Sequence, residues 1–467
     1  MKMIGRREFM GCSSLLLAGA ALPRLATAQM PALPDFYRDI EVRTFRYFWE
    51  TADRRTGMAP DRWPSRAPCS IAAVGFALTC YAIGAERGWC SRAEARDLTL
   101  TTLRFFWNAP QGPQPTGMAG YKGFFYHFLD REQGVRFRQS ELSSVDSALL
   151  FFGVLFAGQY YDAEDPAEAE IRRLADALYA RADWAWFQAG RRAVSMGWHP
   201  EKGFIARDWG GFNEGMGVFI LGLGAPERPL DPRSWEAWTA SYPRFWQGEG
   251  DKRHLAFAPL FGHQYSHLWV DFRGIKDAPM REAGLDYFEN SRRATDANRA
   301  YCAANPMGWS GYSQDVWGLT ACDGPGDFTI GGRHFTGYSA RGPVGQPDGF
   351  DDGTLAPTAA LGSLPFAPEI VIPCAQALLR EHGERLFGAY GFLDSFNPSF
   401  TDISRKPANG RVDAKHGWYD TDYLGIDQGP ILVMAANYRN DFVWSRMRRV
   451  PAIRRGLALA GFTGGWL

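Results

Sequence analysis

One glutamate lies in the segment of the chain with the most concentrated chemistry. Glu214 follows Trp209 and Asn213 in the string RDWGGFNEGM, a glycine-punctuated loop that runs into an apolar stretch. Glycines and aromatic rings around one carboxyl group favour a pocket that withdraws the acid from water and raises its pKa, as a general acid requires. The structural alternative is a glutamate that complements the dipole of the helix it begins. We expect the catalytic role.

A second segment, WYDTDYLGIDQGP, concentrates aspartates among aromatic residues ahead of another apolar stretch. It begins at Trp418 and contains Asp422, Asp427 and Gln428. A glycine on each side of Asp427 indicates that something approaches the backbone closely there. A loop of helix-capping aspartates would have the same composition, so the residues alone leave both interpretations open.

Two further acids, Glu141 and Asp146, lie in the string ELSSVD before a third apolar stretch. Ser143 and Asp146 have the spacing of a helix capping box. A capping aspartate would still project from a helix start toward the loops, so a structural and a functional role are both compatible with this segment.

The composition narrows the class of ligand. Lysine plus arginine total 51 and aspartate plus glutamate total 51, so the chain lacks the basic surplus that binds a phosphate backbone. We therefore expect no nucleic-acid partner. Aromatic residues make up 15% of the chain, and their flat faces are platforms for sugar rings. This composition favours a carbohydrate ligand.

A histidine pair has the spacing of metal ligands. His263, His267 and Asp271 fall four residues apart on one face of a predicted helix. Side chains two turns apart on a straight helix do not converge on one ion, and no His-Glu-x-x-His string accompanies them. We expect no metal, and we expect His263 and Gln264 to donate hydrogen bonds to sugar hydroxyls.

The elements that must position these residues are mainly helices. Strand-like alternation is confined to residues 120–127 and 194–206, and long Gly/Pro-rich loops cover 108–117 and 324–354. We expect these loops to build one face of a single domain. Apolar residues recur at helical spacing over 36–51, 71–85, 93–106, 145–161, 168–185, 214–223, 281–303, 368–380, 423–438 and 449–460.

The first residues have the pattern of an export signal. A basic start with Arg6 and Arg7 precedes an apolar run and the small-residue string Ala26-Thr27-Ala28. The string GRREFM resembles a twin-arginine signal. We expect residues 1–28 to be removed, residues 29–467 to form the mature domain, and the product to be periplasmic or secreted without a membrane span. The six later cysteines lack metal or redox spacing and are expected to be buried apolar groups.

Four blocks of sequence together resemble the bacterial glucoamylase-like family that contains the endo-β-1,2-glucanases of glycoside hydrolase family 144. The resemblance extends from about Phe36 to the end of the chain. The blocks are residues 70–77, residues 261–271, the string DGT at 352–354 with PFAPE at 365–369, and GIDQGP at 425–430.

This resemblance implies an all-α (α/α)6 toroid of six helical hairpins, with short β segments in the loops that form a sugar-binding cleft. It also implies inverting hydrolysis of a β-glucan, most closely β-1,2-glucan, without a cofactor. The family's acidic site residues match Asp146 and Glu214, and Asp427 matches an aspartate proposed as the base. Some relatives have an aspartate where this chain has Ser143, with Glu141 nearby, so the substrate or linkage could differ.

We therefore expect Glu214 to act as general acid, directly or through a sugar hydroxyl, and Asp427 as general base on water. Asp146 and Glu141 would shape the field and bind hydroxyls, in a monomeric enzyme. The remaining candidates for substrate binding are Trp209, Asn213, His263, Gln264, Tyr265, Trp269, Trp309, Trp317, Trp418, Asp422 and Gln428.

Two other functions fit the same sequence. A polysaccharide lyase on the same toroid would need a Tyr, His or Arg base and a site for uronate carboxylates. A periplasmic glycan-binding protein would need aromatic platforms but no opposed carboxyl groups. The glycosidic linkage, the endo or exo mode and any disulfide pairing stay open from the sequence.

Overall fold

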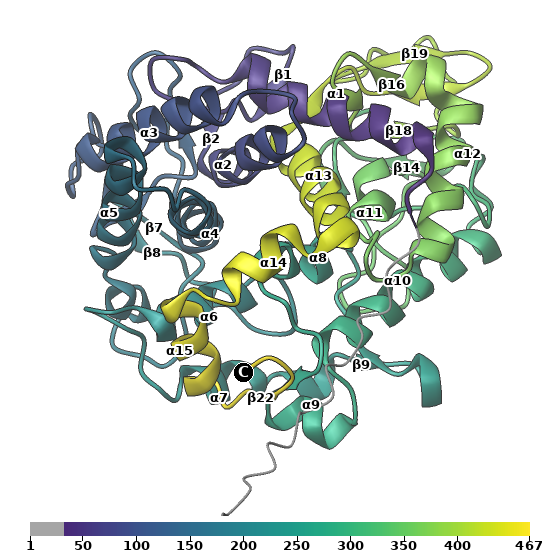
Figure 1. The fold of residues 1–467 in the computed structure, drawn as a ribbon. Coiled ribbons are helices and arrows are strands. Elements are labelled where there is room, and N and C mark those ends of the chain that lie inside the picture. Colours follow the sequence, from purple (N-terminus) through teal and green to yellow (C-terminus); the bar gives the residue numbers. More distant parts are fainter. Residues whose placement is uncertain (1–31) are drawn as a thin grey trace, which may run out of the picture. The chain divides into compact units, whose positions relative to one another are not determined.

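Two layers of helices make up residues 33–467 of the computed structural model, which describes residues 32–467 (Figure 1). The predicted export signal, residues 1–28, lies outside the described residues. Within them, six inner helices follow one another around a ring in which the last packs against the first. They are α2 (Ile71–Glu86), α4 (Ser144–Tyr160), α6 (Met216–Gly224), α8 (Phe261–Trp269), α11 (Pro357–Leu361) and α13 (Gly425–Asn440).

An outer helix precedes each inner helix along the chain and packs against the ring. Six such hairpins closed on themselves are an (α/α)6 toroid, so the predicted fold class is confirmed. The outer helices are α1 (Asp35–Thr51), α3 (Arg92–Asn108), α5 (Pro166–Ala180), α7 (Ser234–Thr239), α10 (Tyr287–Ala304) and α12 (Pro368–Leu386). Three further helices are α9 (Ala278–Ala283), α14 (Phe442–Met447), which contacts α13, and α15 (Pro451–Leu459), which contacts α6.

The two layers differ in how their apolar residues are distributed. In α2 every residue from Ile71 to Gly84 is buried, because this helix has neighbours on all sides. In α5 the buried apolar residues Ile171, Leu174 and Leu178 follow the one-sided spacing of a helix with an exposed face. The pattern therefore separates inner from outer helices.

A close backbone contact joins α2 to α4. A Cβ atom on Gly75 would lie 2.2 Å from the Leu149 carbonyl oxygen, and one on Gly153 would lie 2.1 Å from the Gly75 carbonyl oxygen. Any larger side chain at either glycine would push the two helices apart. These glycines set the spacing of the ring between its first two inner helices.

The ring is closed by the packing of α1 and α2 against α13. Arg439 at the end of α13 donates two hydrogen bonds to the carboxylate of Glu41 in α1, of 3.0 Å and 2.6 Å. Glu41 is only 2% exposed. A buried two-pronged pair of this kind fixes orientation as well as proximity.

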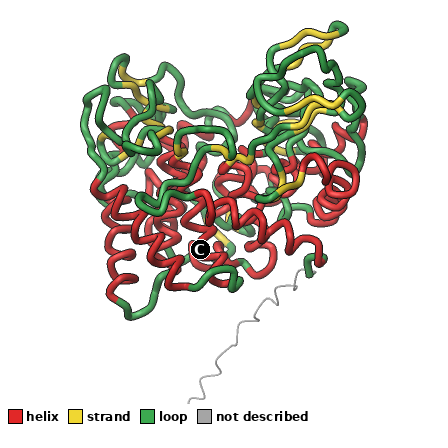
Figure 2. The backbone as a smooth tube through the Cα atoms, turned by 90° about the horizontal axis from the view of Figure 1, so that it is seen from above, coloured by secondary structure: helices red, strands yellow, loops and turns green. Residues whose placement is uncertain are grey.

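Loops and most of the short strands gather at one end of the helices (Figure 2). Three strands run directly into inner helices: β2 (Cys69–Ser70) into α2, β6 (Leu142–Ser143) into α4 and β21 (Tyr423–Leu424) into α13. Their antiparallel partners are β5 (Phe128–Leu129), β7 (Gly197–His199) and β1 (Arg62–Trp63), respectively. The inner helices that follow these strands therefore begin at the loop face.

The other strands of the described chain also form antiparallel pairs or triplets. They are β3 (Gly120–Tyr121) with β4 (Phe124–Phe125), β8 (Gly203–Phe204) with β7, β9 (Trp246–Gln247) with β10 (His254–Leu255), β11 (Ile275–Lys276) with β22 (Thr463–Gly464), β12 (Ala321–Cys322) with β15 (Ser339–Ala340), β13 (Phe328–Ile330) with β14 (Arg333–Phe335), β16 (Phe387–Gly388) with β17 (Gly391–Phe392), and β20 (Gly417–Tyr419) with β18 (Phe396–Asn397) and β19 (Arg411–Asp413).

Two predicted helices are wrong in their extent. The helix expected over 281–303 is divided into α9 and α10, because Gly284 ends α9 with a φ of 75° and Asp286 caps the start of α10 through a hydrogen bond from the Glu289 N–H. The helix expected over 168–185 ends at Ala180, and a 3-10 turn (Trp184–Gln188) follows it. The strand-like runs at 120–127 and 194–206 do contain short strands.

The cysteines behave as apolar residues. Within the described chain all six are free, and only Cys90 is partly exposed. Burial raises the pKa of the Cys69 thiol to about 12, so it has no thiolate character at neutral pH. Among the helices of residues 32–467, none combines the length and the apolar character needed to cross a bilayer.

Candidate active site

A cavity of about 370 Å³ opens at the loop face where the inner helices begin. The starts of α2, α4, α6, α8 and α13 all contribute to its wall. Its polar and aromatic lining residues are Asp61, Arg62, His127, Phe128, Asp146, Glu214, Phe261, Tyr265 and Tyr338, and Ala72, Val145, Leu149, Ala321, Leu424 and Ile426 complete it.

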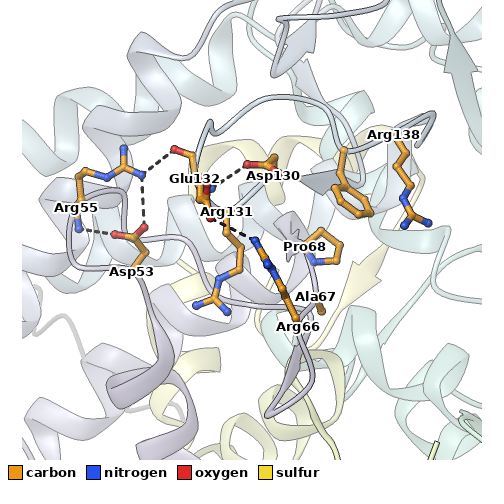
Figure 3. Close-up of a pocket in the computed structure, with 10 residues that line it drawn as sticks. Asp53, Arg55, Arg66, Ala67, Pro68, Asp130, Arg131, Glu132 and Arg138 are labelled. Atoms are coloured by element: carbon orange, nitrogen blue, oxygen red, sulfur yellow. Dashed lines mark hydrogen bonds and ion pairs between the residues drawn. The ribbon is translucent and has the colours of Figure 1, made fainter.

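A larger hollow of about 860 Å³ has a different character (Figure 3). Arg55 pairs with Asp53 over 3.6 Å and Arg66 with Glu132 over 3.4 Å. The Arg66 side chain is 93% exposed, and exposed pairs of this kind contribute little. This hollow contains none of the predicted catalytic carboxyl groups, so the smaller cavity is the candidate active site.

Glu214 lies just before α6 and faces the cavity. Trp209 holds this turn. Its indole N–H donates to Ser144 Oγ over 2.9 Å, and its ring packs so closely on Gly215 that a Cβ atom there would lie only 2.8 Å from the ring. Asn213 Oδ1 accepts from the Gly215 N–H over 3.0 Å. Trp209 and Asn213 therefore shape the loop that presents the carboxyl group.

The Glu214 carboxyl group is set up to carry a proton. Its Oε2 atom is buried and has no hydrogen-bond partner within residues 32–467. Burial, and to a smaller extent the charge of Asp146, raises the pKa of Glu214 to about 7. A carboxyl group with this pKa is still substantially protonated at neutral pH, as a general acid must be.

Asp146 lies beside Glu214 at the start of α4. The Asp146 N–H donates to Ser143 Oγ over 3.1 Å, and the Ser143 hydroxyl donates to Asp146 Oδ2 over 2.5 Å. Only half of the predicted capping box forms, because the carboxylate binds the serine hydroxyl instead of the backbone. The other oxygen, Oδ1, lies 3.5 Å from His127 Nε2, and His127 Nδ1 lies 2.8 Å from Glu141 Oε1.

Asp427 lies in the first turn of α13, is 3% exposed and does not itself line the cavity, whereas its neighbour Ile426 does. The glycines on either side of it serve helix packing. A Cβ on Gly425 would meet Ala73 at 2.6 Å, and one on Gly429 would meet Phe76 at 2.3 Å. The close approach expected from the sequence is therefore the contact of α13 with α2.

A group of buried acids surrounds Asp427. Burial, the charge of Asp394 and a hydrogen bond to its carboxyl group raise the pKa of Asp427 above its ordinary range. Burial and the charge of Asp323 raise the pKa of Asp394 to about 6. Arg62 Nη1 donates to Asp323 Oδ2 over 2.5 Å and lies 3.9 Å from Asp422 Oδ2. A carboxylate in this setting is a strong proton acceptor once it is ionised.

Two groups in the described chain bring potential metal-ligating atoms within 4.8 Å of one another: His127 with Glu141 and Asp146, and Asp323 with Asp394 and Asp420. In the first group the ring nitrogens of His127 lie 2.8 Å from Glu141 Oε1 and 3.5 Å from Asp146 Oδ1, so both nitrogens already face carboxyl groups. The residues with metal-ligand spacing in the sequence are not such a group in the described chain: His263 and His267 are buried in α8, and Asp271 beyond the helix pairs with Arg273 and Arg448.

Several predicted sugar ligands are instead committed to the helix framework. The Gln264 amide donates to the Ala359 carbonyl oxygen and to Ser363 Oγ, 2.8 Å each, and joins α8 to α11. His263 Nε2 accepts from the Phe257 N–H over 3.3 Å, and the His263 side chain is fully buried. The Gln428 amide donates to the Phe392 carbonyl oxygen over 2.8 Å. The roles that these contacts support are structural.

Only some of the predicted stacking residues line the cavity. Tyr265 lines the cavity, and its hydroxyl donates to the Ile426 carbonyl oxygen over 3.1 Å. Trp269 is fully buried between the rings of Phe76 and Phe152, with centroid distances of 5.3 Å and 5.2 Å. The other predicted tryptophans, Trp309, Trp317 and Trp418, are 5%, 1% and 0% exposed and do not line the cavity.

Sequence reasoning missed part of the cavity lining. His127 is the last residue of the run at 120–127, whose alternating pattern predicts a strand but does not indicate a functional histidine. Tyr338 lies in the long loop at 324–354 that was expected to carry function. Asp61 and Arg62 had no local motif, since their partners, such as Asp323, are far away in the chain.

Residues 206–451 match the model of the protein family described as "Putative glucoamylase". The match covers more than half of the chain. The chain belongs to this family. The matched region contains Glu214, the helix α8 and Asp427.

Two glucanase relatives of this glucoamylase-like chain extend the comparison. An exo β-1,2-glucooligosaccharide sophorohydrolase of Parabacteroides distasonis is 28% identical over 450 residues, which is 90% of this chain and 56% of the relative. The chain thus spans about half the length of that curated relative. An endo-β-1,2-glucanase structure from Chitinophaga pinensis, in complex with sophorotriose and glucose, is 26% identical, with a TM-score of 0.79 over 93% of this chain and 100% of that one.

A fungal structure shares the fold alone. The endo-β-1,2-glucanase of Talaromyces funiculosus is 13% identical and superposes with a TM-score of 0.56 over 89% of this chain and 90% of that one. The glucoamylase-like chain therefore has the same helical toroid as a fungal protein with little sequence in common.

Proposed function

We propose that this protein is a glycoside hydrolase that cleaves β-1,2-glucan with inversion, using Glu214 as general acid and Asp427 as general base. The observation that carries the proposal is the buried carboxyl group of Glu214, whose pKa is raised to about 7 in a cavity with Asp146 beside it. Both relatives at 26–28% identity act on β-1,2-linked glucans, as their names state.

In the proposed reaction, Glu214 gives its proton to the leaving oxygen, directly or through a sugar hydroxyl, as the bond to the anomeric carbon breaks. A water molecule forms the new bond on the opposite face of the sugar ring and passes its proton to Asp427. The new hemiacetal then has the inverted configuration. Asp146 supplies negative charge next to the developing positive charge of the ring.

The buried setting of Asp427 fits the proposed base. Its Oδ2 atom has no hydrogen-bond partner in the described part of the chain, so a lone pair is free to accept a proton. Thr358 holds the Asp427 backbone by donating its hydroxyl hydrogen to the Asp427 carbonyl oxygen over 3.1 Å. The Asp394 carboxyl group, whose charge contributes to the raised pKa of Asp427, is a neighbour that can share the acquired proton.

The alternatives have less support from this site. Burial raises the pKa of Tyr265, whose hydroxyl already donates to Ile426, so Tyr265 is a poor base for a lyase. Arg62 is engaged by Asp323 and is not free to bind a uronate carboxylate. A protein that only binds glycans would not need a protonatable glutamate beside a second acid.

The decisive experiment exposes the purified protein to defined β-1,2-, β-1,3-, β-1,4- and β-1,6-glucans and to α-glucans, with products separated by chromatography. We expect release of short oligosaccharides from β-1,2-glucan, and proton NMR of the first product should show the α-anomer. Glu227→Gln, on an exposed glutamate, is the matched control for Glu214→Gln. If the protein cleaves another glucan but not β-1,2-glucan, the proposed substrate is wrong.

We also propose a cellular location and an oligomeric state for the protein. Residues 1–28 have the charge and apolar pattern of a twin-arginine export signal, which supports a periplasmic or secreted location. We propose in addition that the protein is a monomer. Fractionation of cells that carry the native chain or an Arg6→Lys, Arg7→Lys variant tests export. Light scattering of the purified protein tests the monomer.

A further inference from the structure

We propose that His127 is a positioning residue: as a doubly protonated imidazolium between Glu141 and Asp146, it keeps Asp146 ionised and leaves the proton of the site on Glu214. This inference rests on the proposed function, because it assigns the charges of the same cavity. It concerns a residue that has no predicted role from the sequence.

The imidazole of His127 lies between two carboxyl groups, one at hydrogen-bonding distance and the other at ion-pair distance. Nδ1 lies 2.8 Å from Glu141 Oε1 and Nε2 lies 3.5 Å from Asp146 Oδ1. A neutral imidazole carries one N–H and can donate to one carboxylate only, whereas the imidazolium donates to both. The two carboxyl groups face different ring nitrogens, so the charged form can pair with both.

The backbone and the ring of His127 are both fixed. The His127 N–H donates to the Glu141 carbonyl oxygen over 2.9 Å, and its own carbonyl oxygen accepts from the Ile71 N–H over 3.2 Å. The imidazole stacks on Phe128 with centroids 3.8 Å apart and planes 16° from parallel. The side chain is 29% exposed, and turning it away from the two acids would break this stacking contact.

Each oxygen of Asp146 has a partner: a hydrogen-bond donor at Oδ2 and the imidazole at ion-pair distance from Oδ1. Ser143 donates its hydroxyl hydrogen to Oδ2 over 2.5 Å, and His127 faces Oδ1. A carboxylate that only accepts is favoured in its ionised form, because a protonated acid would present a hydrogen to one of these donors. Glu214, by contrast, has an oxygen without a partner in the described chain.

The other charged groups around this triad come from several elements. Asp61, after α1, also faces His127, and His199 of β7 faces Glu141. Arg207 acts on Glu214 from the preceding loop, and Tyr265 of α8 lies near both Glu214 and Asp146. Of these groups, the His127 ring is the one that pairs directly with Asp146.

The balance of charge supports the same assignment. Burial alone would lower the pKa of His127, but the carboxylates of Asp146 and Glu141 outweigh burial and raise it to about 9. Burial raises the pKa of Asp146, and the His127 charge and the Ser143 hydrogen bond work against that rise. Removal of the cation leaves neighbouring acids that share protons, as paired carboxyl groups do.

The test measures charge states on the free enzyme and does not depend on turnover. Carboxyl ¹³C NMR, with Asp146→Asn used for assignment, gives the titration midpoint of Asp146 in wild type, His127→Gln and His127→Lys. We expect His127→Gln to raise this midpoint by about 1–3 pH units, the usual effect of an adjacent opposite charge, and His127→Lys to hold it near the wild-type value. Ring ¹⁵N shifts of His127 should show both nitrogens protonated at pH 8.

Kinetics then show whether the charge assignment acts through Glu214. At pH 7, His127→Gln should lower kcat on β-1,2-glucan by about 10-fold, and in a Glu214→Gln background it should cause no further loss. His334→Gln, which changes an exposed histidine of β14, is the matched control and should alter neither readout.

An unchanged Asp146 midpoint in His127→Gln, or a singly protonated His127 at pH 8, would overturn the inference even if the enzyme is active. A wild-type protein with the expected titrations that cleaves no glucan would instead overturn the proposed function and leave the charge assignment in place. The two failures are therefore distinct.

Discussion

Ser143 and Asp146 are joined by two hydrogen bonds of opposite direction: the Asp146 N–H donates to Ser143 Oγ, and the Ser143 hydroxyl donates to Asp146 Oδ2. The first bond caps the start of α4. The second turns the carboxylate away from the capping position and toward the cavity. The helix cap and the functional acid are thus two residues, three positions apart, with separate tasks.

Substitutions should separate these tasks. Ser143→Ala removes the cap and should lower the free energy of unfolding by about 1 kcal/mol. Asp146→Asn leaves the cap in place and should mainly reduce kcat, because the negative charge beside the sugar ring is lost. Urea unfolding and steady-state kinetics of both variants check this. An Asp146→Asn variant that is less stable but fully active would show that Asp146 is only part of the cap.

Glu214→Gln should lower kcat on natural glucan by about 10²–10⁴-fold, because the amide keeps the shape of the side chain but has no proton to give. A sophoroside with a nitrophenol leaving group needs little protonation, so on this substrate the defect should shrink. Near-normal turnover of β-1,2-glucan by Glu214→Gln would return Glu214 to a structural role at the start of α6.

Asp427→Asn should be equally impaired on natural and activated substrates, because water must be activated in both reactions. Its defect on the nitrophenyl sophoroside, measured beside that of Glu214→Gln, identifies which residue acts on the leaving group and which on water. If the Asp427→Asn defect disappears on the activated substrate, the two roles are exchanged.

The pH dependence follows from the raised pKa of Glu214, about 7. As general acid it must be protonated in the free enzyme, so kcat/KM should fall as pH rises through about 7. Since the pKa is raised on folding, the folded chain binds this proton more tightly than the unfolded chain. Stability from this group is present below the unfolded value of about 4.3 and is lost as pH rises toward 7.

Melting curves at pH 5 and pH 8 test the stability half of this prediction. Glu214→Gln cannot ionise, so its Tm should exceed that of the wild type by more at pH 8 than at pH 5. Glu227→Gln, at an exposed site, should show no such difference. Equal Tm differences at the two pH values would mean that folding does not raise the pKa of Glu214.

The buried pair of Arg341 and Asp352 should be important for stability. Both side chains are 0% exposed, and Arg341 Nε lies 2.7 Å from Asp352 Oδ1. Asp352→Ala leaves the guanidinium buried without its partner and should cost about 3–5 kcal/mol in urea unfolding. Glu132→Ala breaks a pair in which the arginine is 93% exposed and should change stability little.

The sequence was sufficient for most of the helices and for the acids at or just before their starts. Asp146, Glu214 and Asp427 each precede or begin an apolar stretch, so their place at the loop face follows from local pattern. The division at Gly284 was missed because apolar spacing continues across the break, whereas the left-handed φ of 75° is a property of one residue.

The rest of the site depends on contacts between distant segments. Asp394 meets Asp323, 71 residues away, where its carboxylate accepts from the Asp323 N–H over 2.7 Å. Nothing near Asp394 in the chain marks it as the neighbour of Asp427. Trp269 shows the reverse error, since an aromatic residue close to a motif looked like a sugar platform but packs between Phe76 and Phe152.

The pair of Glu41 and Arg439 joins residues 398 positions apart. The ring can therefore close only after α13 has been synthesised, and contacts of such separation form slowly. Until then α2 lacks one of its neighbours, and its apolar surface is exposed to aggregation. Asp427 arrives with that last inner helix, so a nascent chain should acquire catalytic competence in a single late step and not by degrees.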